Sequence, residues 1–337
     1  MSQKKRVLLL TTGGTIASEN SEAGLAPQLA SEGILNYMSD LKDYYDIEAR
    51  DILNLDSSNI QAEEWQTIAR AVMQGIDEDY DGIVITHGTD TMAYTASMLS
   101  FMLQNLKKPV VITGSQMPIA NMLTDARSNL YTAFAAVDCG IKGVSIAFDH
   151  KIINGCRAVK VRTMGFEAFE SVNAPYLGEI YANGMHNYNN REAAEPTGET
   201  VLKDKLCTDV FLLKLIPSTN PEIFDMLMNM NYRGVVLETF GAGGMHYVRR
   251  NLLDKLKMLT EKGISVVACS QCLYETSDFS IYEVGKRLLD CGVIPGRDMT
   301  TEAVVTKLMW ALGQTNDPDE IHKIFNTNFV GEISLNA

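Results

Sequence analysis

Four apolar runs in the first half of the chain share a pattern that limits what it can fold into. Each run is rich in β-branched residues, ends in small polar residues and precedes a segment with helical spacing. The runs are VLLLTT (7–12), GIVIT (82–86), VVIT (110–113) and GVSIAF (143–148). Strands that are apolar throughout are buried on both faces, as in a parallel sheet covered by helices. The pattern predicts an α/β protein whose N-terminal part holds a mainly parallel sheet flanked by helices.

The segments between these strands carry the helix signal. Apolar residues recur at three- and four-residue spacing over 65–76 and over 93–106, the spacing of one helix face. Pro109 prevents the second helix from continuing into the next strand. We therefore expect helices over both ranges.

A second alternation of strands and helices follows a polar segment. That segment, NYNNREAAEPTGETVLKDK at 187–205, has no apolar period, which indicates a linker between domains. We expect a larger N-terminal domain at 1–190, a linker at 191–208 and a smaller C-terminal α/β domain at 209–337. Within the smaller domain we expect strands at 210–215, 234–240 and 264–270, and helices at 221–230, 249–262 and 301–312.

Composition excludes several classes of protein. The chain has 337 residues, 46% hydrophobic and 21% charged, which argues against collagen-like, coiled-coil and disordered chains. Its net charge is -13 and it has no run of five basic residues, so we expect no binding to nucleic acid or to a membrane surface.

The N-terminal and cysteine patterns favour the cytoplasm. The apolar stretch behind MSQKKR spans only 7–10, which is too short for a secretion signal. No apolar stretch reaches the length of a membrane-spanning helix. We therefore expect a cytoplasmic protein whose 6 cysteines are reduced thiols.

Hydroxyl groups dominate the positions that follow the predicted strands. Ligands of open α/β sheets bind beyond the carboxyl ends of the strands, and a threonine or serine nucleophile suits this composition better than a hydride-transfer or metal site. A single Thr or Ser there is also an ordinary helix cap, and Asp90 either caps a helix or orients a base. His87 is a candidate to support the adjoining Gly-Thr-Asp loop. The residues are Thr11, Thr12, Thr15, Thr86, His87, Thr89, Asp90, Thr91, Ser115 and Gln116.

Other motifs give little support for a cofactor. TTGGT lacks the glycine spacing of dinucleotide sites, and no Gly-Lys-Ser/Thr follows a strand. Cys269 and Cys272 have C-x-x-C spacing, but no second Cys/His pair at zinc spacing accompanies them. We interpret them as structural thiols and expect neither a cofactor nor a metal.

Several segments resemble one family. The chain is similar to the bacterial type I, cytoplasmic L-asparaginases, and the resemblance runs from the first strand to the last helix. The matching segments are TGGTIA at 12–17, DSSN at 56–59, GIVITHGTDTMAYTAS at 82–97, VVITGSQMP at 110–118, 125–129, and 157–173 with Lys160 inside it.

The resemblance implies roles for particular residues. Thr15 resembles the threonine that attacks the side-chain amide, and Thr89, Asp90 and Lys160 resemble the group opposite it. Ser57 resembles the serine that holds the substrate's α-carboxylate, with Ser58 as a rival, and Asp90 would also face the α-ammonium. The implied substrate-binding set is Asp56, Ser57, Ser58, Thr89, Asp90, Gly114 and Ser115.

The implied reaction converts L-asparagine and water to L-aspartate and ammonia through a threonine acyl-enzyme, without a cofactor. The family also implies a homodimer or homotetramer whose sites a neighbouring subunit completes, with Asp278 and His246 as candidates for that contribution. The alternatives are a glutaminase, the ammonia-supplying amidase subunit of a transamidation complex, and a non-catalytic amino-acid sensor.

Two positions depart from the family pattern. Leu25 stands where many members carry a tyrosine that contacts the nucleophile. A different group must then accept the proton of Thr15: Lys160 acting with its neighbours, a bound water, or a tyrosine such as Tyr274. Glu238 stands where some members carry an arginine of a regulatory asparagine site, so we do not extend that site to this chain.

Overall fold

The computed structural model describes residues 4–21, 24–27, 29–190, 193 and 195–334. The chain divides into two compact units. The larger comprises Met1–Arg191 with Glu195–Asp204, and the smaller comprises Glu192–Ala194 with Lys205–Ala337. Part of the segment expected to be a linker is paired: β14 (Val201–Leu202) lies antiparallel to β6 (Leu103–Gln104) in the larger unit.

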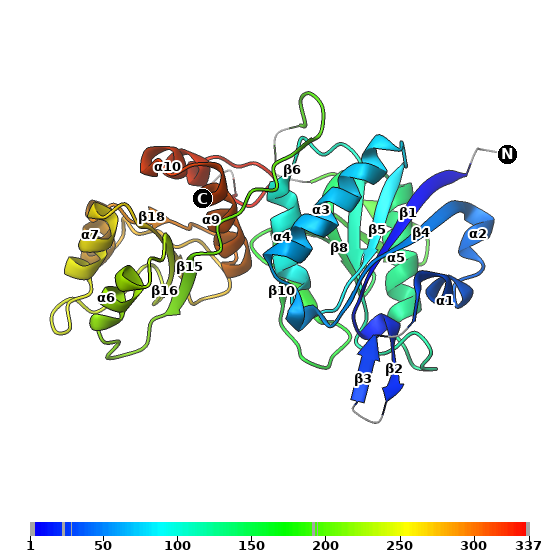
Figure 1. Cartoon of the computed structure of the whole chain (residues 1–337), viewed down its shortest axis with the longest axis horizontal. Coiled ribbons are helices and arrows are strands. Elements are labelled where there is room, and N and C mark those ends of the chain that lie inside the picture. Colours follow the sequence, from blue (N-terminus) through cyan, green and yellow to red (C-terminus); the bar gives the residue numbers. More distant parts are fainter. Residues whose placement is uncertain (1–3, 22–23, 28, 191–192, 194, 335–337) are drawn as a thin grey trace. The chain divides into compact units, whose positions relative to one another are not determined.

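An 8-stranded sheet forms the centre of the larger unit, in the order β13-β12-β9-β8-β7-β5-β1-β4 (Figure 1). The five strands from β8 to β4 are parallel, and β9, β12 and β13 extend that sheet in antiparallel pairing. The strands are β1 (Lys5–Gly13), β4 (Tyr45–Leu55), β5 (Gly82–Thr86), β7 (Pro109–Thr113), β8 (Gly143–Phe148), β9 (Lys151–Asn154), β12 (Gly178–Tyr181) and β13 (Gly184–Asn187).

The predicted strands form the buried centre of this sheet. Every residue of β5, β7 and β8 is buried, as expected of strands with helices on both faces. The prediction of a mainly parallel sheet flanked by helices is therefore confirmed. The edge strand β4 escaped the prediction, because its residues alternate between exposed and half-buried positions and include charged side chains.

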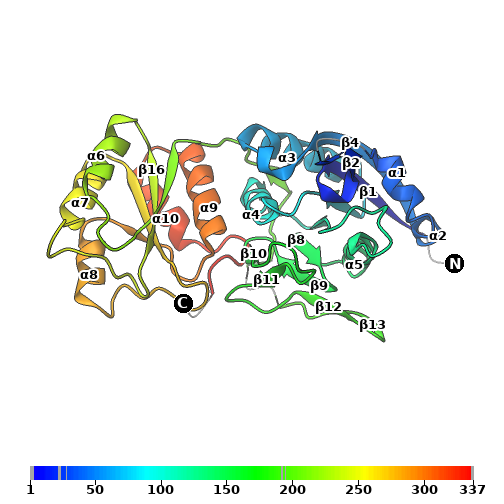
Figure 2. The same ribbon diagram turned by 90° about the horizontal axis from the view of Figure 1, so that it is seen from below.

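Helices cover both faces of the sheet (Figure 2). Val7 and Leu9 of β1 pack in one core cluster with residues of α1 and α5. The helices α3 and α4 lie on the opposite face, where the alternate strand positions such as Leu8 point. The helices of this unit are α1 (Ser31–Asn36), α2 (Leu41–Tyr44), α3 (Ala62–Asp77), α4 (Met92–Met102) and α5 (Ala126–Asp138).

The helix expected over 93–106 is shorter than predicted. It ends at Met102, because Leu103 leaves helical geometry and, with Gln104, pairs with β14. The sequence prediction also did not include the hairpin of β2 (Ser18–Ser21) and β3 (Gly24–Pro27) or the antiparallel pair of β10 (Ala158–Lys160) and β11 (Phe169–Ser171).

The smaller unit contains a parallel sheet in the order β15-β16-β17-β18. The predicted strands match β15 (Val210–Lys214), β16 (Gly234–Thr239) and β17 (Ser265–Ser270), and β18 (Ile294–Pro295) adds an edge. The prediction that the smaller domain has an α/β fold is therefore confirmed. Its helices are α6 (Glu222–Asn229), α7 (Leu253–Glu261), α8 (Glu283–Asp290), α9 (Thr301–Gln314) and α10 (Pro318–Asn326).

Two details of the smaller unit differ from the sequence prediction. The helix expected from 249 begins at Leu253, where Asn251 accepts a hydrogen bond from the Leu253 N–H. The helices α8 and α10 were not predicted. Over the residues that the structure describes, no helix has both the length and the apolar character needed to cross a membrane.

Candidate active site

The strand order puts a topological switch point at β1. This strand lies between β4 and β5, which follow it in the chain but occupy opposite sides of it. In open parallel sheets the crevice beyond the carboxyl ends of the strands at such a point is the usual ligand site. Here it is bordered by the loops that follow β1, β4, β5 and β7, which contain most of the residues that the family resemblance singles out.

Two glycines allow three of these loops to touch. Gly14 has φ 80, and a Cβ on it would lie 2.4 Å from the backbone nitrogen of Gly88. A Cβ on Gly88 would lie 2.5 Å from Oγ of Ser57. Only glycine permits backbones to approach this closely. The loops carrying Thr15, Ser57 and Thr89 are therefore packed directly against one another.

Lys160 closes the site from β10. Its Nζ lies 2.8 Å from Oγ1 of Thr89 and 2.6 Å from Oδ1 of Asp90. The Lys160 side chain is 17% exposed, whereas that of Asp90 is 65% exposed. Since Nζ donates to the Thr89 oxygen, the Thr89 hydroxyl hydrogen remains available, and it is directed to Oε1 of Gln116 at 3.3 Å. The structure thus joins the three predicted residues in one hydrogen-bonded group.

Thr15 begins a short 3-10 helix, η1 (Thr15–Ala17), directly after the turn at Gly14, whose φ of 80 suits glycine. It is half-buried, unlike Ile16 and Ala17, which are buried in the core. Thr15 therefore lies, half-buried, just beyond the carboxyl end of β1, where the switch point lies.

The DSSN segment separates the two rival serines. Asp56 caps the short helix η2 (Ser57–Asn59) by accepting hydrogen bonds from the Ser58 N–H at 2.8 Å and the Ser58 hydroxyl at 2.6 Å. These hydrogen bonds lower the pKa of Asp56. Asp56 and Ser58 are exposed, whereas Ser57 is buried against Gly88, and its carbonyl accepts from the Thr91 hydroxyl at 2.7 Å. Ser57 is thus the serine packed against the loop of Thr89, whereas the Ser58 side chain is hydrogen-bonded to Asp56.

The loop after β7 is held from the start of α5. The carboxylate of Asp125 accepts the Gln116 N–H at 3.0 Å, and Nδ2 of Asn129 donates to the carbonyl of Gly114 at 2.9 Å. Ser115 is buried, and its hydroxyl donates to a carbonyl within the same loop at 2.5 Å. Asp125 and Asn129 had no role assigned from the sequence, and their position in a matched segment was the only signal for them.

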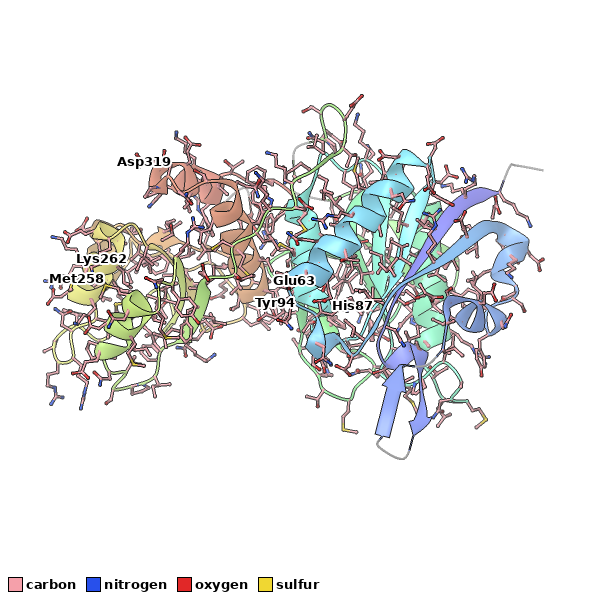
Figure 3. All side chains as sticks on the ribbon, viewed as in Figure 1. Glu63, His87, Tyr94, Met258, Lys262 and Asp319 are labelled. Atoms are coloured by element: carbon pink, nitrogen blue, oxygen red, sulfur yellow. The ribbon has the colours of Figure 1, made fainter. Side chains whose placement is uncertain are left out.

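His87 begins the loop after β5, but its side chain is buried in the core (Figure 3). It is fully buried, and its Nδ1 is 2.7 Å from the carbonyl oxygen of Gly88 while its Nε2 is 2.9 Å from Oγ1 of Thr95. Burial lowers the pKa of His87 to about 4. The imidazole is consequently neutral at physiological pH.

Three candidate residues belong to the smaller unit. Nε2 of His246 is 3.1 Å from the carbonyl of Thr219. The carboxylate of Asp278 accepts hydrogen bonds from Ser280, which lower the pKa of Asp278. Tyr274 is exposed. Their contribution to the site stays a prediction.

The two departures from the family pattern lie in different units. Leu25 is in β3, opposite Asn20 of β2, but its side chain is outside the part of the chain that the structure describes. The carboxylate of Glu238 accepts the Thr301 hydroxyl at 2.8 Å and lies 3.3 Å from Nζ of Lys214.

The C-x-x-C cysteines lie in different surroundings. Cys269 is buried at the end of β17, where burial raises the pKa of its thiol to about 12, and Cys272 is exposed. Among the described residues, no three His, Cys, Asp or Glu side chains are grouped so that they could hold a metal ion.

Comparison with known proteins covers both units. Residues 6–193 match the family model described as "Asparaginase, N-terminal", and residues 209–325 match the "Glutaminase/Asparaginase C-terminal domain". An L-asparaginase of Thermococcus kodakarensis is 46% identical, over 98% of this chain and 99% of the relative. The solved structure of a thermostable L-asparaginase from that organism has a TM-score of 0.92 at 45% identity, covering 98% of this chain and 99% of that chain.

A second kind of relative is also similar. A glutamyl-tRNA(Gln) amidotransferase subunit of Sulfurisphaera tokodaii is 34% identical, over 99% of this chain but 76% of the relative. Both domain models, an end-to-end relative and the architecture of the switch-point site agree, and the chain belongs to the asparaginase family.

Proposed function

We propose that the protein is an L-asparaginase, which hydrolyses L-asparagine to L-aspartate and ammonia. The observation that carries this proposal is the hydrogen-bonded group of Lys160, Thr89 and Asp90 beside the Thr15 loop. Such a group surrounds a threonine hydroxyl with proton donors and acceptors, which a hydroxyl nucleophile requires. The end-to-end similarity to an L-asparaginase supports the same substrate class.

The substrate's own charges indicate how it binds. A free amino acid presents one carboxylate and one ammonium, which require hydroxyl or N–H donors on one side and a carboxylate on the other. In the proposal Ser57 donates to the α-carboxylate, and Asp90 accepts from the α-ammonium. Gly114 and Ser115 border the side-chain amide. Asp56 and Ser58 act through the shape of the η2 turn, since their side chains bond to each other.

The reaction proceeds in two acyl-transfer steps. The Thr15 oxygen attacks the amide carbon, the C–N bond breaks, and protonation of the leaving nitrogen releases ammonia. Water then attacks the aspartyl-threonine ester, which releases L-aspartate and restores the Thr15 hydroxyl. The N–H of Thr89 faces the oxyanion of each tetrahedral intermediate, an interaction of the kind worth about 3–4 kcal/mol in comparable hydrolases.

The proton of Thr15 leaves through the Thr89–Lys160–Asp90 group in this proposal. Lys160 donates hydrogen bonds both to Thr89 and to the carboxylate of Asp90. Once Lys160 has passed one proton to that carboxylate, its neutral amine can accept, through the Thr89 hydroxyl, the proton that leaves Thr15. Leu25 cannot hydrogen-bond through its side chain. This path therefore takes the place of the tyrosine that many family members use.

Three other functions remain as alternatives. The amidotransferase relative favours an ammonia-supplying subunit, but this chain spans 76% of that relative and 99% of an L-asparaginase. A glutaminase would use the same groups with a substrate one methylene longer. An amino-acid sensor would not require the lysine beside Thr89. We therefore propose an enzyme rather than a sensor.

We extend the proposal to assembly and location. The family resemblance supports a homodimer or homotetramer in which His246 or Asp278 reaches a neighbouring site, and it supports a cytoplasmic location. The acidic net charge of -13 is consistent with a partner that is not nucleic acid.

A coupled ammonia assay with L-asparagine and L-glutamine tests the proposed function. We expect turnover of L-asparagine at a higher kcat/KM than that of L-glutamine. Higher kcat/KM for L-glutamine would establish the glutaminase alternative, and no ammonia from either substrate would contradict the proposal. To test the proposed oligomer, the assay is repeated over a range of protein concentrations, and light scattering reports whether the oligomer or the monomer is present at each one.

A further inference from the structure

A chain of three hydrogen bonds runs through the core behind the loop of Thr89. Nε1 of Trp65 in α3 donates to Oγ1 of Thr95 in α4 at 3.0 Å. The same Oγ1 is 2.9 Å from Nε2 of His87, and Nδ1 of His87 is 2.7 Å from the carbonyl oxygen of Gly88. Thr95 and His87 are completely buried and Trp65 is nearly so. Figure 3 marks His87 at the end of the sheet nearest the β2–β3 hairpin.

The chemistry of the two ends sets the direction of every hydrogen bond in this chain. The indole N–H can only donate and a carbonyl oxygen can only accept. Since Oγ1 of Thr95 accepts from Trp65, its own hydrogen is free to go to Nε2 of His87, which must then be the unprotonated nitrogen. The proton of the neutral imidazole therefore resides on Nδ1, from which it is donated to Gly88.

This bond also sets the orientation of the next peptide unit. The described chain has no cis peptide bond, and in a trans peptide the C=O and the following N–H point in opposite directions. Because the Gly88 carbonyl points at the buried imidazole, the N–H of Thr89 points away from it. Among the described residues, no hydrogen bond uses this N–H as its donor.

We propose that His87 is a positioning residue that, held by Thr95 and Trp65, directs the Thr89 N–H at the carbonyl oxygen of the bound amide. The proposal rests on the proposed function, in which Thr89 borders the reacting carbonyl. His87 itself touches neither the substrate nor Thr15. It acts through the Gly88–Thr89 peptide. Because Gly88 has a flexible backbone, this peptide could otherwise rotate.

The pKa of His87, lowered to about 4 by burial, supports this assignment. A neutral ring keeps one donor and one acceptor, so its two partners are not interchangeable. The charged side chains beside the loop that it faces, Asp90 and Lys160, are paired with each other.

Two substitutions of His87 distinguish the roles of its two ring nitrogens. The amide nitrogen of His87→Asn can occupy the position of Nδ1 and donate to Gly88. The amide of His87→Gln instead reaches the position of Nε2 and leaves the Gly88 carbonyl without a donor. We expect His87→Gln to lower kcat by about 10² with KM changed less than about threefold, as for loss of an oxyanion donor. His87→Asn should recover most of that loss.

Substitutions further along the chain test its direction. Thr95→Val removes the hydroxyl that holds Nε2 unprotonated and should lower kcat, and Thr95→Ser should restore it. Ser100→Ala is a matched control, because Ser100 is a buried hydroxyl on the same helix that donates to the Ala96 carbonyl at 2.8 Å. It should leave kcat unchanged.

A long-range 1H–15N NMR correlation of the wild-type protein provides a readout that is independent of activity. We expect the Nδ1–H tautomer for His87, unchanged from pH 8 to pH 5, and its loss in Thr95→Val. An Nε2–H tautomer would overturn the proposal. So would equal kcat values for His87→Asn and His87→Gln when both fold. If the wild type hydrolysed neither amide, the proposed function would fail, while the tautomer result would still report on the hydrogen-bond chain.

Discussion

Nζ of Lys160 lies 2.6 Å from Oδ1 of Asp90, although 70 positions separate the two residues in the chain. Asp90 follows the central strand β5, whereas Lys160 ends β10, which belongs to a separate two-stranded sheet. The pair brings a cation to a threonine at the switch point of the large sheet.

Replacement of the proposed nucleophile should remove turnover without unfolding the protein. Thr15 is half-buried at the start of η1 and contributes little to the core. We expect Thr15→Ala to retain less than about a tenth of the wild-type rate, with Thr15→Ser more active because it keeps a hydroxyl. Ammonia release measures turnover, and a thermal melt of the same sample shows whether the variant is folded. A properly folded Thr15→Ala with higher activity would exclude Thr15 as the nucleophile.

Lys160→Met should lower kcat by at least about 10², the usual range of proton-transfer assistance. The side chain is replaced by one of similar length that cannot move a proton. Lys151→Met is the matched control, since Lys151 is also a partly buried strand lysine, 3.2 Å from the carboxylate of Asp149, in the same unit. Steady-state kinetics of both variants make the comparison. A near-normal kcat in Lys160→Met would show that Lys160 has no role in proton transfer.

Leu25→Ala should act mainly on KM. A leucine side chain neither accepts a proton nor hydrogen-bonds, so removing it should leave the proposed proton path intact, and we expect the effect to come from loop closure around the substrate. The same kinetic assay separates the two parameters. A collapse of kcat would show that the hairpin organises the nucleophile directly.

The smaller unit contains a buried ion pair that should be costly to break. Nζ of Lys307 lies 2.6 Å from Oε1 of Glu332, and both side chains are 0% exposed. Lys307→Met would leave the carboxylate buried without its cation, which costs about 3–5 kcal/mol in unfolding free energy. Lys323→Met removes an exposed pair with Glu320 and should cost less than about 1 kcal/mol. Urea denaturation measures both, and equal midpoints would contradict the prediction.

The titration of His87 should make the protein less stable in acid. Its pKa in the folded state is about 4, below the ordinary value of 6.5, so the unfolded chain binds more protons between these values. Stability from this residue is full above pH 6.5 and falls as the pH drops toward 4, by about 3 kcal/mol in all.

The control for this titration is His87→Asn, which cannot titrate in that range. Urea midpoints at pH 7 and pH 5 should fall further in the wild type than in this variant. Parallel decreases in the two proteins would show that His87 does not contribute to acid sensitivity.

Local sequence was sufficient to predict a strand wherever that strand is buried on both faces. The runs at 82–86 and 143–148 have no exposed position in the structure, so their apolar character alone marks them as central strands. The edge strand β4 has no such signal, because half of its surroundings are solvent. The end of α4 at Met102 also required knowledge of a partner, β14, which lies about a hundred positions away in the chain.

The sequence by itself determined the α/β class, the buried central strands of both units and the loops that carry Thr15, Thr89 and Asp90, because buried strands and their polar ends are written in consecutive residues. Only the tertiary structure decided which of these groups meet. The pairing of Lys160 with Asp90, the burial of Ser57 against Gly88 and the hydrogen bonds that link Trp65 to Gly88 depend on distances between segments far apart in sequence. Such distances follow from packing of the whole fold, which no local pattern encodes.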